Sequence, residues 1–468
     1  MRYLRFVLLS VFAICATVVA ENPIPFINQP LMPDSAQPGG KGFTLTINGA
    51  GFVSGATVHW NEHSLPTTFV SGTQLTAAVP RSDISHAQTA TITVGNPRPG
   101  GGSSNPVFFP VRRPAKSVAL QENALGNVSV LGGSIAVADF NGDGILDFAN
   151  CDYDVAVSLG NGDGTFKAPS IISQMNCNGK ILAGDFNGDG KVDLAVLQDD
   201  VLIFLGNGDG TFQNAIDTGG LPLYTWSFTA GDFNRDGKLD LAIGGLDSDN
   251  FGVVILLFGK GDGTFRAPKE VRVNNSGSNG VGVVYVATAD INHDGNLDLA
   301  VVSQTSINHR AIFALLGQGD GSFKVLPRVG SGYGDLALAD VNGDGNLDMV
   351  SDVGDIVVRL GNGDGTFDRP VGYKVAGGCC GDLVVGDFNG DGIPDIGVAR
   401  DNYPGDPFIN VLRGVGDGTF EPDLKFTSSL YTGGYLAIGD FNDDGKLDFL
   451  MSSSPDFGGV DVYLQEPK

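Results

Sequence analysis

The stretch Asp139-Phe140-Asn141-Gly142-Asp143-Gly144-Ile145-Leu146-Asp147 carries the pattern D-x-N-x-D-G-x-x-D, which occurs seven times in this chain. The copies begin at Asp139, Asp185, Asp232, Asp290, Asp340, Asp387 and Asp440, so their starts lie 46 to 58 residues apart. Segments of this length cannot each bury an apolar face alone, and neighbouring copies must stack to share a core. The spacing therefore predicts seven supersecondary units that make up most of the molecule.

The predicted elements follow the same order in every unit. In the first unit, an apolar strand over residues 135–139 leads into the Asp-rich loop, and strands over 145–149 and 154–159 follow. A Gly-rich turn over residues 160–166 then opens a fourth strand, and this turn recurs at 206–212, 259–265, 317–323, 361–367 and 414–420. Four short antiparallel strands per repeat are typical of a propeller blade. We therefore expect an all-β fold in which residues 113–468 form a seven-bladed β-propeller.

The seventh unit lacks the Gly-rich turn, and its third strand, over residues 460–464, is followed by only four residues. An unpaired strand at that edge would expose backbone hydrogen-bonding groups and promote association. Residues 115–120, which precede the first unit, align with residues 167–172 in the fourth strand of the first blade. We predict that residues 115–120 supply the outer strand of the last blade and close the ring.

Residues 23–112 follow a different pattern. Alternating runs at 43–47, 56–60 and 90–94 are separated by turns rich in Gly, Pro and Asn. Short alternating strands with such turns indicate a small β-sandwich. Residues 97–106 have the composition of a linker, although residues 107–111 fit a last strand of the sandwich, and we place the domain boundary near Arg113.

Both parts resemble known families. The seven repeats, over residues 117–464, look like the FG-GAP or VCBS repeats of the integrin α-subunit N-terminal propeller. The first domain is similar to the IPT/TIG immunoglobulin-like family in its Gly49-Ala50-Gly51-Phe52 and Val94-Gly95-Asn96-Pro97 segments. The resemblance of the first domain rests on turn and core residues, so it implies a fold and no chemistry.

Each repeated loop offers oxygen ligands at five positions. Positions one, three, five and nine supply side-chain oxygens, position seven supplies a backbone carbonyl, and the Gly at position six permits a sharp turn. This set of hard oxygens suits Ca²⁺, so we predict about seven calcium ions, one per blade. The predicted ligands are Asp139, Asn141, Asp143, Ile145 and Asp147; Asp185, Asn187, Asp189, Lys191 and Asp193; Asp232, Asn234, Asp236, Lys238 and Asp240; Asp290, Asn292, Asp294, Asn296 and Asp298; Asp340, Asn342, Asp344, Asn346 and Asp348; Asp387, Asn389, Asp391, Ile393 and Asp395; and Asp440, Asn442, Asp444, Lys446 and Asp448.

Other metal assignments fit these loops less well. Mg²⁺ needs a tighter octahedron and usually keeps several waters, while zinc and copper favour His or Cys. The loops also lack the Glu at position twelve that an EF-hand uses. Simple solvated acidic turns would not keep Asn at position three in all seven copies. The Asp of the Gly-rich turn, such as Asp163, fits hairpin chemistry better than a second metal site.

The first twenty residues predict export. Residues 1–20 combine a basic start, an apolar stretch and a small-residue cleavage site after Ala20, which is the pattern of a signal peptide. We expect a secreted or extracytoplasmic protein, in the periplasm or at the cell surface, with no membrane insertion after signal cleavage. A net charge of −25 argues against nucleic acid as a partner. Among the cysteines, a Cys151–Cys177 disulfide is plausible, and Cys379 and Cys380 could be bridged or free.

The repeats suggest two functional classes. The first is an extracellular calcium-binding adhesion or binding module, monomeric, that recognises a protein or a glycan through the variable loops of the face opposite the calcium loops. The aromatic residues to test there are Tyr224, Trp226, Tyr333, Tyr403 and Tyr435. The alternative is a carbohydrate-active enzyme, similar to a polysaccharide lyase on the same fold. We identify no catalytic residues, because no trio of nucleophile, base and orienting group is visible in the sequence.

Overall fold

The computed structural model describes residues 21–465 except for several short segments, which are 116, 125–132, 152–153, 175–178, 222–223, 274–281, 307–308, 333, 378–380, 401–406, 422–423, 429, 431–433 and 454–458. The described residues form β-strands and no helix, and so they include no helical segment able to cross a membrane. The predicted signal peptide, residues 1–20, lies outside the described residues.

The N-terminal domain is a sandwich of two sheets. One sheet has the order β1 (Phe26–Ile27), β2 (Phe43–Ala50), β6 (Gln74–Val79), β5 (Thr67–Ser71). The other has the order β4 (His63–Ser64), β3 (Thr57–Trp60), β7 (Gln88–Asn96), β8 (Gly102–Ser103), and β9 (Val107–Val111) also pairs with β7. Along β7 buried and half-buried residues alternate strictly, as expected when one face of a strand packs on the core.

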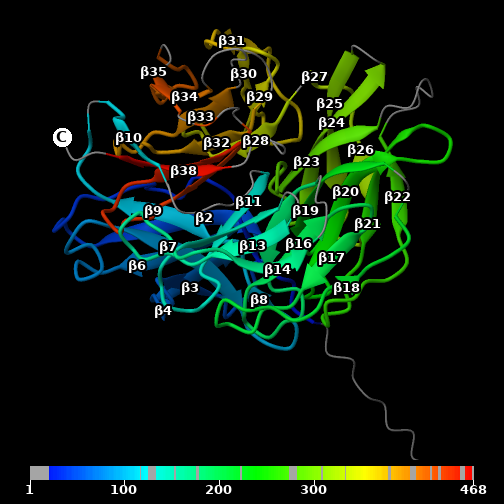
Figure 1. Ribbon diagram of the computed structural model, residues 1–468, viewed down its shortest axis with the longest axis horizontal. Coiled ribbons are helices and arrows are strands. Elements are labelled where there is room, and N and C mark those ends of the chain that lie inside the picture. Colours follow the sequence, from blue (N-terminus) through cyan, green and yellow to red (C-terminus); the bar gives the residue numbers. More distant parts are fainter. Residues whose placement is uncertain are drawn as a thin grey trace, which may run out of the picture.

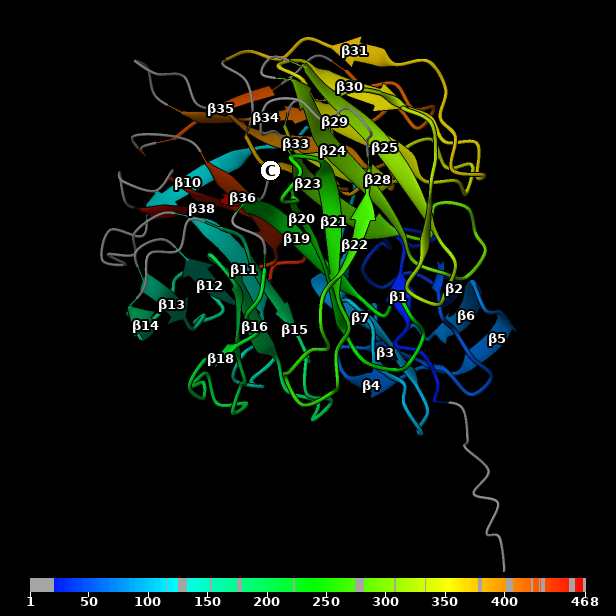
Figure 2. The ribbon, with the colours of Figure 1, turned by 90° about the vertical axis from the view of Figure 1, so that its right-hand side faces the viewer.

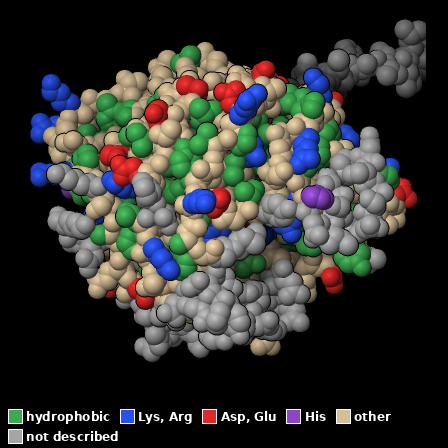
Figure 3. Space-filling view, turned by 90° about the horizontal axis from the view of Figure 1, so that it is seen from above, with side chains coloured by type: hydrophobic (Ala, Val, Ile, Leu, Met, Phe, Trp, Pro, Cys, Tyr) green, Lys and Arg blue, Asp and Glu red, His purple; other side chains and the backbone are tan. Residues whose placement is uncertain are grey.

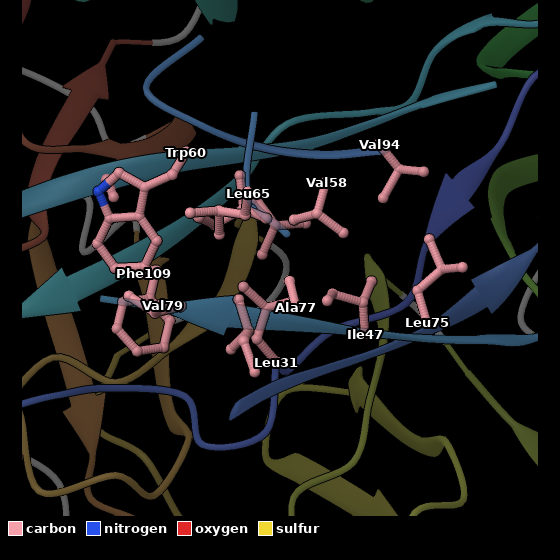
Figure 4. Close-up of a cluster of buried hydrophobic side chains, with 14 of the residues drawn as sticks. Leu31, Ile47, Val58, Trp60, Leu65, Leu75, Ala77, Val79, Val94 and Phe109 are labelled. Atoms are coloured by element: carbon pink, nitrogen blue, oxygen red, sulfur yellow. The ribbon is translucent and has the colours of Figure 1, made fainter. Parts of the chain in front are cut away.

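The core of this sandwich contains one large aromatic pair. Trp60 is only 1 % exposed, and its ring centroid lies 5.2 Å from that of Phe109. Figure 4 shows Trp60 and Phe109 at one end of the core and Ile47, Leu75 and Val94 at the other. Trp60 therefore serves packing and is not part of a surface patch.

Seven further sheets form the propeller blades. Six of them use four consecutive strands: β11 (Ser134–Ala138), β12 (Asp147–Cys151), β13 (Asp154–Ser158), β14 (Ser170–Gln174); β15 (Ile181–Gly184), β16 (Asp193–Leu197), β17 (Val201–Phe204), β18 (Ile216–Asp217); β19 (Thr225–Gly231), β20 (Asp240–Leu246), β21 (Gly252–Leu257), β22 (Lys269–Arg272); β23 (Val283–Ala289), β24 (Asp298–Ser306), β25 (His309–Gly317), β26 (Phe323–Val325), with the short β27 (Gly330–Ser331) also on β25; β28 (Leu336–Ala339), β29 (Asp348–Asp352), β30 (Ile356–Arg359), β31 (Val371–Tyr373); and β32 (Leu383–Gly386), β33 (Asp395–Arg400), β34 (Phe408–Leu412), β35 (Leu424–Thr427).

The seventh blade joins the two ends of the repeat region. Its order is β36 (Tyr435–Gly439), β37 (Asp448–Ser452), β38 (Val460–Gln465), β10 (Leu120–Ala124). Figures 1 and 2 show the cyan β10 beside the red β38. The inner strands β11, β15, β19, β23, β28, β32 and β36 contact one another in this order, and β36 contacts β11 again, so the ring is closed. The predicted all-β fold, a seven-bladed propeller behind a β-sandwich, is confirmed.

The closing strand differs in register from our prediction. We assigned it to residues 115–120, whereas β10 spans Leu120–Ala124, with Leu120 opposite Gln465. The backbone N–H of Ala115 instead donates to the carbonyl oxygen of Asn389 in the sixth blade, at 2.8 Å. The chain therefore needs several residues to travel from that contact to the free edge of β38, and pairing starts later.

Two strand boundaries in the first blade also differ from the prediction. The second strand of the first blade begins at Asp147 and not at residue 145, because residues 145 and 146 still belong to the loop. The fourth strand begins at Ser170, and Phe166 forms only an isolated bridge with Gly160. Each second strand consequently starts at the ninth residue of the D-x-N-x-D-G-x-x-D pattern.

Candidate functional site

All seven Asp-rich loops lie at one end of the ring. Each loop connects the inner strand of a blade to the second strand, and in the first blade Ala138 and Asp147 are opposite each other where the two strands meet. This placement agrees with the repeat pattern, because every inner strand runs from the other end of the ring toward its loop. The predicted metal-binding residues are therefore gathered as seven similar loops on one face.

Backbone amides determine the shape of each loop. In the first blade, Oδ1 of Asp139 accepts a hydrogen bond from the N–H of Gly142 and Oδ2 accepts one from Gly144, both at 2.8 Å. The side-chain oxygens of Asn141 and Asp143 accept bonds from the N–H groups two residues further on, at 2.8 and 2.9 Å. The second blade repeats these bonds. Such Asx-type bonds curl the backbone around the oxygens of positions one, three and five.

The Asp at position nine has a role that the sequence did not reveal. In the first blade, Oδ2 of Asp147 accepts a bond from the N–H of Phe140, at 2.9 Å, and Oδ1 accepts one from the N–H of Gly160, at 2.8 Å. The equivalent pair of bonds occurs in every blade. This carboxylate therefore ties the Asp-rich loop to the turn between the third and fourth strands. The sequence signal that could have predicted this tie is the Gly that opens all six copies of the Gly-rich turn.

The seventh blade keeps this tie without the turn. There, Oδ1 of Asp448 accepts its bond from the backbone N–H of Gln465, at 2.9 Å, which takes the place of the missing glycine. Burial of these position-nine carboxylates is the largest influence on their acidity, and it raises the pKa of Asp240 and of Asp298 to about 8 although the amide bonds oppose the rise.

The loops also join neighbouring blades. The carbonyl oxygen of Phe140 accepts a bond from the N–H of Gly210 in the next blade, at 3.0 Å. The ring of Phe140 lies against Phe212 with centroids 5.8 Å apart and an interplanar angle of 67°. The same pairing of a loop ring with the turn ring of the next blade occurs in Phe186–Phe265, Phe233–Phe323 and Phe441–Phe166. These four loops are therefore part of the seams between blades.

Whether these loops fit a metal ion depends on their donor atoms. Within the described parts of the chain, no three His, Cys, Asp or Glu side chains converge as a ready-made metal site. Each loop nevertheless brings three carboxylates and an Asn amide into one turn, and these are hard oxygen donors. In the third blade, Oδ1 of Asp236 is buried without a hydrogen-bond partner, and Nζ of Lys238 lies 4.0 Å away. That oxygen would be satisfied by a cation, so the residues present fit Ca²⁺.

The second recurrent Asp belongs to the hairpin turn. Oδ1 of Asp163 accepts bonds from Oγ1 and from the backbone N–H of Thr165, at 2.5 and 3.0 Å, and these two bonds lower the pKa of Asp163. Equivalent bonds are made by Asp209, Asp262, Asp320, Asp364 and Asp417. These carboxylates hold the turn, as expected for hairpin chemistry.

A polar cluster occupies the opposite end of the ring. Nζ of Lys180, from the second blade, lies 3.7 Å from Oδ2 of Asp335 and 3.6 Å from Oδ1 of Asp382, in the fifth and sixth blades. It also lies 4.3 Å from the ring centroid of Tyr285. Because the second blade faces the fifth and sixth across a seven-bladed ring, Lys180 reaches across the central channel. The sequence does carry a signal for this cluster that our prediction missed, because Lys180, Tyr285, Asp335 and Asp382 each lie five residues before the first Asp of their loop.

Burial and charge act in opposite directions on Asp335 in this cluster. Burial raises the pKa of Asp335 well above its usual value, Lys180 opposes that rise, and the charge and hydrogen bond of Asp382 add to it.

Two of the predicted aromatic residues are exposed at the same end of the ring. Tyr224 and Trp226 stand at the start of the inner strand β19 and are 60 % and 38 % exposed. Their ring centroids are 6.3 Å apart and their planes differ by 13°. Tyr435 begins the inner strand β36 at the same end of the ring. Tyr333 and Tyr403 lie outside the described residues.

The cysteine predictions are only partly addressed by the structure. Cys151 is buried and disulfide-bonded. Cys177, Cys379 and Cys380 lie outside the described residues, so the Cys151–Cys177 pairing stays a prediction.

Comparison with family models identifies both parts of the chain. The FG-GAP-like repeat model matches residues 139–196, 185–243, 340–398 and 387–451, and the IPT/TIG domain model matches residues 28–111. The chain is an FG-GAP-like repeat protein with an IPT/TIG domain. Each match of this FG-GAP-like repeat protein begins at the first Asp of a loop, and the loop of the fourth blade, which starts at Asp290, lies outside the matched ranges.

Solved structures similar to this FG-GAP-like repeat protein have low sequence identity. An auxiliary nutrient binding protein from Bacteroides ovatus is 11% identical, with a TM-score of 0.39, over 95% of this chain and 98% of that one. The WD40 domain of Toxoplasma gondii coronin is 13% identical, with a TM-score of 0.47, over 76% and 89%. The periplasmic gluconolactonase of Pseudomonas aeruginosa is 15% identical, with a TM-score of 0.44, over 67% and 91%. Likenesses of this size say nothing about what this chain binds. A search of curated protein sequences found no match.

Proposed function

We propose that this protein is an exported, calcium-loaded binding module that recognises a glycan at the end of the propeller opposite the Asp-rich loops. The observation that carries the proposal is the exposed pair Tyr224 and Trp226, whose rings lie nearly parallel at the end of the ring where the inner strands begin. Export is supported by the predicted signal peptide at residues 1–20.

The aromatic pair suits the apolar face of a sugar ring. Large aromatic side chains cost free energy when they are left in water, so an exposed neighbouring pair is a common mark of a binding site. A pyranose ring presents C–H groups on one face, which pack against an aromatic ring, and hydroxyl groups around its edge, which need hydrogen-bond partners. Parallel rings offer two such platforms along one chain of sugars.

The channel cluster supplies partners for the hydroxyl groups. Lys180 is a donor, while Asp335 and Asp382 offer carboxylate oxygens, and all three side chains are partly exposed. The separations of 3.6 and 3.7 Å between Nζ and the carboxylates are longer than direct hydrogen bonds, so these groups keep bonding capacity for a ligand.

The charge distribution agrees with a neutral ligand better than with a polyanion. The chain carries a net charge of −25. On the face drawn in Figure 3, Lys and Arg side chains are dispersed among other residues and form no continuous basic patch. Nucleic acid and other polyanions depend on concentrated positive charge.

Calcium would stiffen the other end of the ring. Three carboxylates in one turn repel one another, and an ion held by the loop residues would relieve that repulsion and stabilise the folded state. Because the loops of the first, second, third and seventh blades are also bonded to the next blade, as in the Phe140–Gly210 bond, stiff loops would hold those blades in register under the recognition face.

A glycan array with the mature protein tests the proposal. We expect a defined set of glycans to bind, and Tyr224→Ala and Trp226→Ala to weaken that binding by at least about tenfold, as for the loss of a central aromatic contact. Phe69→Ala is the matched control, since Phe69 is an exposed aromatic residue, 41 % accessible, on the sandwich.

Three other results would contradict this proposal. Binding that survives both substitutions would place the site elsewhere, and capture of a protein ligand alone would exclude a glycan as the natural partner. Release of unsaturated or reducing sugars during incubation would show instead the carbohydrate-active enzyme that we consider as the alternative.

A further inference from the structure

The IPT/TIG sandwich covers the metal-loop end of the propeller, and it covers it unevenly. Figures 1 and 2 show its blue strands packed against the ring of blades. We infer that the sandwich caps five of the seven loops, those of the third to seventh blades, so that the chain holds calcium in two classes of site. Five capped ions would exchange slowly and two open ions would respond to calcium in solution. The inference rests on the calcium loading proposed above.

The first capped loop belongs to the third blade. The backbone N–H of Ile24 donates to Oδ2 of Asp232 at 2.9 Å, so the sandwich bonds directly to a predicted metal ligand. Lys238, which supplies the predicted carbonyl ligand, also pairs through Nζ with Oε2 of Glu21 at 2.6 Å. A Cβ atom placed on Gly237 would lie only 2.5 Å from the carbonyl oxygen of Asn22. The sandwich therefore touches this loop without an intervening water layer.

The fourth and fifth loops are capped by one short segment. Asn28 donates through Nδ2 to the carbonyl oxygen of Asp290, at 3.1 Å, and its Oδ1 accepts a bond from the N–H of Asp290, at 3.3 Å. The carbonyl oxygen of Gln29 accepts a bond from the N–H of Asp340, at 3.2 Å. Both Asp290 and Asp340 are buried. Residues 28–29 thus recognise the first position of two adjacent loops.

The sixth and seventh loops are capped by the last strands of the sandwich. Arg112 is buried, and its Nη2 donates to the carbonyl oxygen of Asp387 at 2.5 Å and lies 3.5 Å from Oδ1 of the same residue. The backbone N–H of Thr89 donates to Oδ2 of Asp440 at 3.1 Å. Both contacts again involve the first Asp of the loop.

The first and second loops have no such cover. The hydrogen bonds to the side chains of Asp139 and Asp185, the first Asp residues of these loops, all come from the backbone of the same loop, and the described residues of the sandwich make none to them. Asp139 and Asp185 are half-buried, whereas Asp232, Asp290, Asp340 and Asp387 are buried. The two open loops are neighbours in the ring, so one sector of the metal face stays in contact with solvent.

Apolar side chains, as well as hydrogen bonds, hold the sandwich on the loops. Phe26 and Ala50 pack in one cluster with Phe233 and Leu297, which belong to the loops of the third and fourth blades. Phe108 packs in another cluster with Phe388 of the sixth loop. Because these contacts are made by apolar side chains of the capped loops and not by the two open loops, the cap would remain in place while the open ions exchange, and it would have to lift before a capped ion could leave.

Release kinetics test this inference on the full mature chain. The calcium-loaded protein is mixed with a fluorescent chelator, and the total metal is counted by elemental analysis. We expect two ions to leave in a fast phase and five in a slow phase, with rates that differ by at least about fivefold, the lower end of ordinary coupling between sites. Release of all the bound ions in a single phase would overturn the inference.

Matched substitutions assign the two phases. Asp185→Asn, in an open loop, should remove amplitude from the fast phase, and Asp290→Asn, at the same position of a capped loop, should remove it from the slow phase. Asn28→Ala leaves every loop intact and should speed part of the slow phase. Two results together would contradict the capping. Asp185→Asn and Asp290→Asn would each lose the same amplitude from both phases, and the rate of the slow phase would be unchanged in Asn28→Ala.

The two proposals fail in different ways. If the purified chain binds no calcium at all, the proposed calcium loading is wrong, and so is the division into capped and open calcium sites. If it binds calcium and releases it uniformly, only the capping is wrong.

Discussion

At the scale of single residues, the Asp at position nine is a predicted metal ligand that also bonds to two backbone amides of its own blade. In the second blade, Asp193 is fully buried, and its two oxygens accept bonds from the N–H groups of Gly206 and Phe186 at 2.7 and 2.9 Å. An ionised carboxylate can satisfy both donors and still direct lone pairs at a cation, because each oxygen accepts more than one bond. This position is therefore constrained even without metal.

Asp193→Asn should destabilise the protein measurably. The amide that replaces one oxygen is a donor, so it would face a backbone N–H across a buried contact and cost about 1–3 kcal/mol. Chemical denaturation in the presence of calcium measures the change in free energy of unfolding. Asp199→Asn, at an exposed position after the same strand, is the control and should change stability by less than about 0.5 kcal/mol. Equal stability of the two variants would disprove the structural role of Asp193.

The clustering of the Asp-rich loop residues could be predicted from the sequence, whereas the channel cluster was missed. The loop residues lie within nine consecutive residues, so their spacing alone brings them together. Lys180, Asp335 and Asp382 lie in three different blades and meet only when the ring closes. Each stands five residues before the first Asp of its loop, so the repeat marks them as equivalent positions, but it does not show which of these side chains meet across the ring.

At the scale of elements, the seams between blades depend on the Gly-rich turns. Gly210 has φ of 80°, and its N–H donates to the carbonyl oxygen of Phe140 in the preceding blade. A Cβ atom placed there would lie 2.9 Å from Cδ2 of Leu159, which is closer than packed carbon atoms approach. The turn is therefore restricted both by its backbone conformation and by the neighbouring blade.

Gly210→Ala should lower the free energy of unfolding by more than the cost of backbone strain alone. Gly220 has φ of 79° and no atom within 4 Å of a Cβ placed on it, so Gly220→Ala measures the strain without the clash. Strain at such a position costs about 1–3 kcal/mol, and overpacking adds a similar amount. Thermal unfolding of the two variants gives the comparison. If Gly220→Ala is as destabilised as Gly210→Ala, the seam contributes nothing.

The closing strand shows why element boundaries were only partly predictable. The free edge of β38 required a partner, and the sequence before the first repeat contained a suitable segment. Its register depends on where the chain leaves the sandwich, which is fixed by the contact between Ala115 and Asn389, a pair far apart in the sequence. The need for a closing strand was thus predictable, while its span, Leu120–Ala124, was not.

Removal of β10 should cause the propeller to self-associate. A chain of residues 113–468 keeps β10, whereas a chain of residues 125–468 leaves β38 with an unpaired edge. Light scattering of the two purified chains should show a monomer for the first and higher-order association for the second. A monomeric 125–468 chain would mean that the edge of β38 is protected in another way.

At the scale of the whole molecule, the two ends of the ring have different surroundings. The end with the Asp-rich loops is bonded to the sandwich through Ile24, Asn28 and Arg112, while the other end presents the exposed Tyr224 and Trp226. The docking of the sandwich could not be foreseen from the sequence, because the contacts join residues 208 to 275 positions apart. A ligand would therefore approach the end that the sandwich leaves open.

The central claim, that the seven loops hold calcium as part of the fold, is tested most directly by one measurement. Thermal unfolding of the mature chain with calcium and with chelator is recorded together with a metal count by elemental analysis. We predict about seven calcium ions per chain and a large drop in the unfolding temperature after chelation, because ions that bind only the folded state stabilise it. Little bound metal and an unchanged unfolding temperature would show that the loops are acidic turns held by their own backbone amides.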